Sequence, residues 1–235
     1  MSRPQAQGLH VDWGRRPYDA MHALQARLVL LRAKRVIPNL LLTGEHDPVV
    51  TLGRKTPEGA AYDPSLQVVK VERGGVATYH GPGQLVAYPI VHLTDARRDL
   101  HRFQRDLEEI GLRTLADFGI EGHRVDAYTG VWVGEKKVQS LGIAVRRWVT
   151  WHGLALNVNT DLGPFMRFSP CGLDGNVMTS MADLLGAPVD FDAARARLVH
   201  HAGELLPGGP FAPGSMDALE ATLAAEEGSA AGPVS

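Results

Sequence analysis

The residue with the clearest chemical potential in this chain is Cys171, the only cysteine among its 235 residues. It lies in the stretch Phe165 to Val177, FMRFSPCGLDGNV, between Pro170 and Gly172. A single thiol is commonly an inert, buried small side chain. This one is predicted to lie in a turn just before a helix that begins near Asn176, and a helix N-terminus favours the thiolate. Nucleophilic sulfur chemistry is therefore one hypothesis, and a structural cysteine is the other.

A second candidate is the stretch Arg73 to Gln84, RGGVATYHGPGQ, in which four glycines and one proline fall within twelve residues. This composition excludes an ordinary helix and is typical of backbone that approaches a ligand closely. The stretch matches neither the Walker phosphate loop nor the GxGxxG of a dinucleotide-binding fold. Its polar side chains offer a cation, hydroxyls, an imidazole and an amide, and they are Arg73, Thr78, Tyr79, His80 and Gln84. We expect a binding groove, with a plain turn as the alternative.

Lys137 lies in GEKKVQSLGIAV, at the start of a predicted strand. By itself it is consistent with a solvated lysine at the edge of a sheet. Next to a cysteine it would have a clear role, because its ammonium stabilises a thiolate and, once deprotonated, accepts a proton from an incoming amine.

The chain contains ten histidines but no HExxH motif, and a single cysteine cannot build a structural zinc site. We therefore expect no metal. His80 in YHGPG and His152 in WHGLA are the two histidines predicted to lie near the chemistry, because glycines flank both.

The elements that position these residues follow from hydrophobic periodicity and turn signals. The predicted strands are Leu9 to Trp13 at an edge, Leu40 to Thr43, Val49 to Leu52 after a turn, Gln67 to Glu72, Leu85 to Val91, and an antiparallel meander of Thr129 to Val133, Lys137 to Val145 and Val149 to Val158. The predicted helices are one opened by Pro17, one capped by Asp99 and ended by Gly119, Met178 to Leu185, and Phe191 to Leu206 capped by Asp190. This order favours an α+β domain with a mixed, largely antiparallel sheet flanked by helices.

We expect one catalytic domain over residues 1–206 and a Gly/Ala/Pro-rich extension over 207–235, partly disordered, with the last ten residues or so disordered. The 44% of hydrophobic residues suffice for a full core, and the net charge of −2 gives no general attraction to nucleic acid or membranes. No apolar run reaches 18 residues, so we expect a soluble, cytoplasmic protein.

Five segments in this order, GEHDPVVTLGR, RGGVATYHGPGQLVAYP, KVQSLGIAV, WHGLALNVN and PCG, resemble the octanoyltransferases of lipoate biosynthesis, also called lipoyl(octanoyl) transferases. The resemblance runs from about Leu9 to Leu206. It implies an α/β domain with a curved mixed sheet, shared with biotin and lipoate protein ligases. It also implies transfer of an octanoyl group from octanoyl-acyl carrier protein to a lysine of a lipoyl domain, in a 2-oxoacid dehydrogenase complex or in the glycine cleavage H protein.

By the same resemblance, Cys171 of PCG is the acyl-accepting nucleophile and Lys137 is its partner. The implied substrate-binding residues are Arg73, Gly74, Gly75, Val76, Ala77, Thr78, Tyr79 and His80, then Ser140, Leu141 and Gly142, then Gly153, Leu154 and Ala155, with His152 and Gln84 in support. Neither a cofactor nor a metal is implied, because a thioester donor is already activated.

Three other functions are compatible with parts of the pattern. An ATP-dependent lipoate or biotin ligase shares the implied fold, but the GRGRxGR pattern of biotin ligases is absent. A cysteine hydrolase would use Cys171 with His80 or His152 and release the acyl group to water. A non-catalytic module that binds an acyl carrier would have no use for both Cys171 and Lys137.

Overall fold

The computed structural model describes residues 7–58, 65–94, 97–168 and 174–230, so Cys171 lies outside the described residues. Eight strands form one mixed sheet in the order β11-β1-β2-β6-β10-β9-β8-β7. β11, β1 and β2 run parallel to one another, and the remaining neighbours pair antiparallel. The strands are β1 Leu9–Arg16, β2 Leu40–His46, β6 Gln84–Ile90, β7 His123–Val125, β8 Tyr128–Val133, β9 Lys136–Arg146, β10 Val149–Asn157 and β11 Ala212–Pro213.

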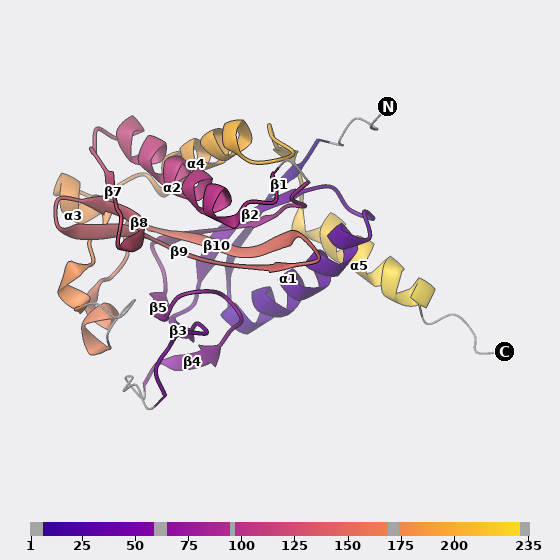
Figure 1. The fold of residues 1–235 in the computed structure, drawn as a ribbon, viewed down its shortest axis with the longest axis horizontal. Coiled ribbons are helices and arrows are strands. Elements are labelled where there is room, and N and C mark those ends of the chain that lie inside the picture. Colours follow the sequence, from indigo (N-terminus) through magenta and orange to yellow (C-terminus); the bar gives the residue numbers. More distant parts are fainter. Residues whose placement is uncertain (1–6, 59–64, 95–96, 169–173, 231–235) are drawn as a thin grey trace.

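A separate three-stranded sheet has the order β4-β3-β5, with β3 Val49–Leu52 at its centre. β4, Gln67–Lys70, pairs with it in parallel, and β5, Ala77–His80, pairs antiparallel. In Figure 1 this small sheet lies below the large one. The glycine-rich segment, Arg73 to Gln84, therefore contains β5 of the small sheet and ends where β6 of the large sheet begins.

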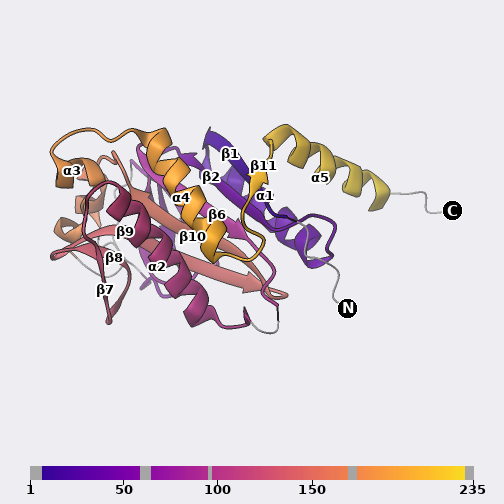
Figure 2. The same ribbon diagram turned by 90° about the horizontal axis from the view of Figure 1, so that it is seen from above.

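Helices cover both faces of the large sheet (Figure 1). α2 and α4 lie side by side over one face (Figure 2), where they enclose a core that includes Phe103, Leu107 and Leu198. α1 and α5 lie over the other face, with Met21, Leu28 and Leu219 in a second core. The described helices are α1 Tyr18–Ala33, α2 Leu100–Asp117, α3 Met181–Leu185, α4 Phe191–Leu205 and α5 Met216–Ala230. None of them is long and apolar enough to cross a membrane.

Capping residues set the starts of α2 and α4 as the sequence predicted. The Asp99 carboxylate accepts a hydrogen bond from the backbone N–H of Arg102 at 3.0 Å, and Asp190 accepts one from Ala193 at 3.0 Å. Gly119 follows α2 with a φ of +74°, a left-handed conformation in which glycine carries no steric cost.

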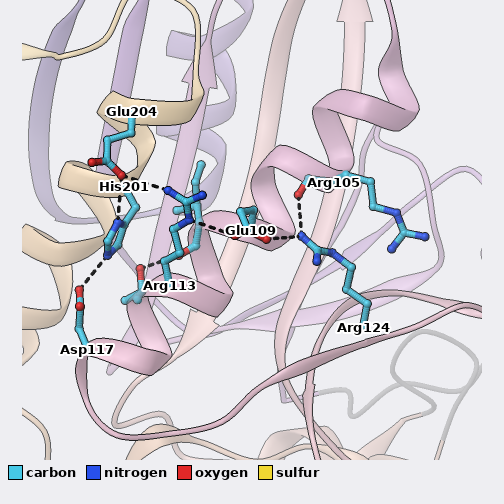
Figure 3. Close-up of polar contacts among 9 residues, drawn as sticks. Arg105, Glu109, Arg113, Asp117, Arg124, His201 and Glu204 are labelled. Atoms are coloured by element: carbon cyan, nitrogen blue, oxygen red, sulfur yellow. Dashed lines mark hydrogen bonds and ion pairs between the residues drawn. The ribbon is translucent and has the colours of Figure 1, made fainter.

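An ionic network joins the two helices that cover the first face (Figure 3). Arg113 of α2 contacts Glu109 at 3.0 Å and Glu204 of α4 at 3.2 Å. Asp117 of α2 accepts from His201 of α4 at 2.8 Å. Most of these groups are partly exposed, so each ion pair contributes little to stability.

The antiparallel meander of β8, β9 and β10 is confirmed, and so is the mixed, largely antiparallel sheet with flanking helices. Other elements differ from the prediction. β1 is not an edge strand, because Leu9 pairs with Ala212 of β11. β2 and β3 follow each other along the chain but belong to different sheets.

The helix expected near Asn176 is a short 3₁₀ helix, Gly175–Val177, and α3 begins only at Met181. Met178 lies between this 3₁₀ helix and α3, and its backbone pairs with Lys137 of β9. A second short 3₁₀ helix covers Gly163–Arg167.

The C-terminal extension, which was expected to be partly disordered, contains regular structure. After Pro207 the chain adds β11 to the large sheet and forms α5, which extends away from the domain (Figure 2). Met216, Leu219 and Leu223 of α5 are buried against the core around α1, and this burial offsets the ordering entropy. Residues 231–235 lie outside the described residues.

Candidate active site

A cavity of about 540 Å³ lies between the glycine-rich segment and the middle of β9 and β10. Cavities of this size commonly bind small ligands. The predicted substrate residues that line it are Arg73, Gly74, Gly75, Val76, Thr78, His80, Ser140, Leu141, Gly142, Gly153, Leu154 and Ala155. Lys137 and His152 line it as well. Segments that are far apart in the sequence therefore meet at one site.

Ala77 and Tyr79 do not line this cavity, although both were predicted to contact substrate. Both lie in β5, where successive side chains point to opposite sides. Thr78 and His80 face the cavity, whereas Ala77 and Tyr79 pack in a hydrophobic cluster with Phe165. The sequence motif alone does not reveal this alternation.

Arg73 holds the glycine-rich segment in place from inside the protein. Only 6% of the residue is exposed, and its Nη2 donates to the backbone oxygen and the hydroxyl of Thr51, both at 2.8 Å. Its Nη1 donates to the carbonyl oxygens of Val76 at 2.8 Å and Gly74 at 3.0 Å. The backbone N–H of Gly74 in turn donates to the carbonyl of Ile143 in β9 at 3.0 Å. This geometry indicates that Arg73 shapes the cavity wall.

The register between β9 and β10 brings the other two predicted segments together. Gly142 pairs with Gly153, and Leu141 pairs with Leu154. Ser140 pairs with Ala155 of β10, and the buried Ser140 Oγ has no hydrogen-bond partner among the described residues. A polar oxygen in the wall of a cavity without a protein partner is available to a ligand.

Lys137 is a buried lysine at the wall of the cavity. Only 3% of the residue is exposed, and its Nζ lies 5.7 Å from the centroid of the Trp132 ring. Its carbonyl accepts from the backbone N–H of Thr179 at 3.0 Å. The plain alternative of a solvated edge lysine is therefore wrong for this side chain, which is enclosed.

A chain of directed hydrogen bonds fixes the tautomer of His80. Asn157 Nδ2 donates to the backbone oxygen of Thr179 at 2.9 Å, so Asn157 Oδ1 accepts from Gln84 Nε2, also at 2.9 Å. Gln84 Nε2 also donates to the carbonyl of Tyr79 at 3.1 Å. Gln84 Oε1 must then accept from His80 Nδ1–H at 2.6 Å, which leaves Nε2 of His80 as a hydrogen-bond acceptor. Gln84 supports the site in this way without lining the cavity.

Three buried histidines near the cavity are neutral. Burial lowers the pKa of His80 to about 3, with a further contribution from His46, and burial likewise lowers the pKa of His152 to about 3. The pKa of His46 is lowered to about 4 by burial. His46 Nδ1 lies 3.0 Å from the carbonyl of Arg16 and its Nε2 lies 2.8 Å from Tyr88 Oη, so Nδ1 carries the proton and Nε2 accepts from the tyrosine.

Several lining residues were not predicted. They are Tyr18, Lys55, Tyr88, Gln104, Ala127, Tyr128, Thr129 and Ile143. From the sequence pattern, Tyr18 is predicted to be an ordinary core residue of an amphipathic helix, and Tyr88 is predicted to belong to a buried strand. A tyrosine in an otherwise apolar element could have indicated these lining positions, because a buried polar atom needs a partner.

Comparisons with known proteins identify the family of the chain. The sequence model described as the lipoyl protein ligase A/B catalytic domain matches residues 17–203. The octanoyltransferase of Syntrophotalea carbinolica is 46% identical over 195 residues, which cover 83% of this chain and 92% of that protein. The octanoyltransferase of Geobacter metallireducens is 43% identical over 78% of this chain and 86% of that protein.

Solved structures resemble the fold at lower identity. The bipartite lipoate protein ligase of Thermoplasma acidophilum aligns with a TM-score of 0.73 at 20% identity, over 94% of this chain and 91% of that chain. A lipoate-protein ligase A bound with ATP aligns with a TM-score of 0.71 at 19% identity, over 95% and 94% of the two chains. These two likenesses concern the fold alone. On the matched catalytic domain and its curated relatives, the chain belongs to the lipoyl protein ligase A/B catalytic domain family and is an acyltransferase of the octanoyltransferase family.

Proposed function

We propose that this acyltransferase moves an octanoyl group from octanoyl-acyl carrier protein to a specific lysine of lipoyl domains, through a thioester on Cys171. The observation that carries the proposal is the enclosed Lys137 in the wall of a cavity that also has an apolar side. Val76, Leu141 and Leu154 contribute that apolar side, which suits an acyl chain.

In the first half-reaction, the Cys171 thiolate attacks the carbonyl carbon of the donor thioester. A new C–S bond forms, the bond to the phosphopantetheine sulfur breaks, and that sulfur takes a proton from the Lys137 ammonium and leaves as a thiol, so that Lys137 becomes neutral. The ammonium of Lys137 is the counterion of the Cys171 thiolate, and backbone N–H groups near Gly142 and Gly172 stabilise the oxyanion.

In the second half-reaction, the acceptor lysine amine attacks the octanoyl-Cys171 carbonyl. Neutral Lys137 accepts the proton that the amine loses, the amide C–N bond forms, and the Cys171 thiolate is released. Because an amide is more stable than a thioester, this step drives the transfer. Neither ATP, a cofactor nor a metal takes part in this proposal.

The residues on the C-terminal side of Cys171 support a Cys171–Lys137 pair. Met178 pairs with the backbone of Lys137, and the Nζ of Lys136 donates to the carbonyl of Asn176. The chain that follows the cysteine is therefore attached to the strand that carries the lysine.

Two acceptors for the octanoyl group are proposed, the lipoyl domains of 2-oxoacid dehydrogenase complexes and the glycine cleavage H protein. The curated relatives are named octanoyltransferases, and a Thermoplasma acidophilum structure concerns a lipoate protein ligase and its E2 lipoyl domain. The second of these names supports a lipoyl domain as acceptor.

The low basicity of the buried histidines argues against the hydrolase alternative. A hydrolase would need His80 or His152 as general base, but the pKa of each is about 3, so both are weak bases at neutral pH. The alternative of an ATP-dependent ligase is not favoured by any feature of the described residues.

The test combines purified protein, octanoyl-acyl carrier protein and a lipoyl domain without ATP, and follows both products by mass spectrometry. The proposal expects octanoylated lipoyl domain and little free octanoate. Free octanoate as the main product would indicate a hydrolase. Modification that requires ATP and free octanoate would indicate a ligase.

A further inference from the structure

A group of three possible metal ligands lies next to the cavity. His22 comes from α1, Glu72 from the segment after β4, and His152 from β10. One ligand atom from each residue lies within 4.8 Å of the other two. His22 Nε2 is 2.9 Å from Glu72 Oε2, and His152 Nε2 is 4.0 Å from the same oxygen. The proposed acyl transfer uses neither His22 nor Glu72.

An unpartnered nitrogen points to a ligand at this position. His152 is only 2% exposed, and its Nε2 has no hydrogen-bond partner among the described residues. The His152 backbone is fixed, because its N–H donates to Gln25 Oε1 at 2.8 Å. A buried polar atom without a partner is destabilising, so a ligand for this nitrogen would stabilise the structure.

We propose that His22, Glu72 and His152 bind one Zn²⁺ ion. Two imidazole nitrogens and a carboxylate oxygen are a donor set that zinc accepts, with a fourth position open to water. Bond lengths of about 2.0–2.2 Å place neighbouring tetrahedral ligand atoms about 3.3 Å apart. The distances of 2.9 and 4.0 Å from the Glu72 oxygen lie on either side of that value. The side chain of Glu72 is 58% exposed and free to adjust.

Tyr18 completes the arrangement around His152. Its hydroxyl oxygen lies 3.5 Å from His152 Nδ1. A zinc-bound Nε2 requires the proton on Nδ1, and the tyrosine oxygen is positioned to accept that hydrogen bond, as partners of metal-bound histidines do. No metal motif is visible in the sequence, because the three ligands come from separate elements.

Binding at this site would inhibit the enzyme. His152 lines the cavity, and Glu72 directly precedes Arg73, which holds the glycine-rich segment. An ion bridging α1, this segment and β10 would lock the cavity wall. The binding itself does not depend on the proposed acyl transfer, whereas the inhibition does.

A second group of possible ligands, His200, His201 and Glu204 of α4, serves as the contrast. His201 Nδ1 has no hydrogen-bond partner among the described residues, but the side chains of His200 and Glu204 are 58% and 47% exposed. Glu204 also lies 3.2 Å from Arg113, and His201 Nε2 lies 2.8 Å from Asp117 (Figure 3). We expect no tight zinc binding there, because Glu204 would have to give up Arg113 and two of the three ligands are open to water.

The experiment titrates Zn²⁺ into the full chain against a chromophoric chelator, in a Cys171→Ser background that removes the competing thiol. We expect one bound ion, and at least about tenfold weaker binding in His22→Ala and in Glu72→Gln. The control His200→Ala should bind as the parent does. Co²⁺ in place of zinc should give the visible absorption of a four-coordinate site.

A thermal melt provides a second readout that does not rely on the chelator. Zn²⁺ should raise the Tm of the parent by mass action, and this rise should vanish in Glu72→Gln, whose metal-free Tm should match the parent. With Cys171 present, acyl transfer should be less sensitive to Zn²⁺ in Glu72→Gln than in the parent. Absence of binding, unchanged binding in both ligand variants, or loss of binding in His200→Ala would each overturn the site.

Discussion

The side chain of Arg73 passes directly over Gly142. A Cβ at position 142 would lie 2.6 Å from Arg73 Cδ, closer than two carbons can approach. The guanidinium of Arg73 is held by Thr51, Val76 and Gly74, so the stem of this side chain has little freedom to move. Glycine at position 142 is therefore a steric requirement of the cavity wall.

Gly142→Ala should displace Arg73 and with it the glycine-rich segment. We expect a loss of about 1–3 kcal/mol in the free energy of unfolding, and a larger proportional loss of acyl transfer, because the cavity wall moves. Denaturant unfolding and steady-state kinetics measure the two effects. Gly228→Ala in α5 is the control, since a Cβ there meets no atom within 4 Å. Wild-type kinetics in Gly142→Ala would show that the close contact does not shape the site.

The neutral histidines should make the protein less stable in mild acid. Their pKa values in the folded state, about 3 for His80 and about 4 for His46, lie below the unfolded value of about 6.5. The unfolded chain therefore binds more protons below pH 6.5. The stabilising effect is complete above that pH and is lost as the pH falls towards 4, by up to about 1.4 kcal/mol per pH unit for each histidine.

The measurement is the free energy of unfolding between pH 7 and pH 4.5, compared with His46→Gln. The variant is expected to be less stable at pH 7 but to show a shallower decline, because one of the titrating groups is gone. His200→Gln, at an exposed position, should decline as the parent does. Equal slopes in parent and His46→Gln would mean that His46 is not held neutral.

Lys137→Met should slow the alkylation of Cys171 at neutral pH. Removing the ammonium raises the pKa of the thiol, so the rate against pH should shift to higher pH. Iodoacetamide kinetics over a range of pH values report this shift. Lys70→Met is the control, because Lys70 is an exposed lysine of β4 that does not line the cavity. An identical profile in Lys137→Met would remove the lysine from the proposed pair.

Much of the architecture was predictable because it rests on local signals. The caps at Asp99 and Asp190, the meander of β8 to β10 and the cavity segments around Arg73 and Gly142 all follow from short patterns or from the family resemblance. The pairing partners were not predictable in this way. Contacts between distant residues decide that β2 and β3 belong to different sheets and that β11 pairs with β1.

The candidate site shows the same limit. Motifs identified Lys137 and His80, but not Tyr18 or the orientation of Tyr79. Tyr18 reaches the cavity only because α1 packs across β10, and Tyr79 turns away because of the strand alternation in β5. Neither fact is contained in a motif of a few residues.

The most direct test of the central claim is the intact mass of the protein after incubation with octanoyl-acyl carrier protein alone, and again after a lipoyl domain is added. Our account predicts a gain of one octanoyl group that hydroxylamine removes, that is absent in Cys171→Ala, and that moves to the lipoyl domain in the second step. A Cys171→Ala variant that still acquires the octanoyl group, or transfers it at the parent rate, would contradict the account.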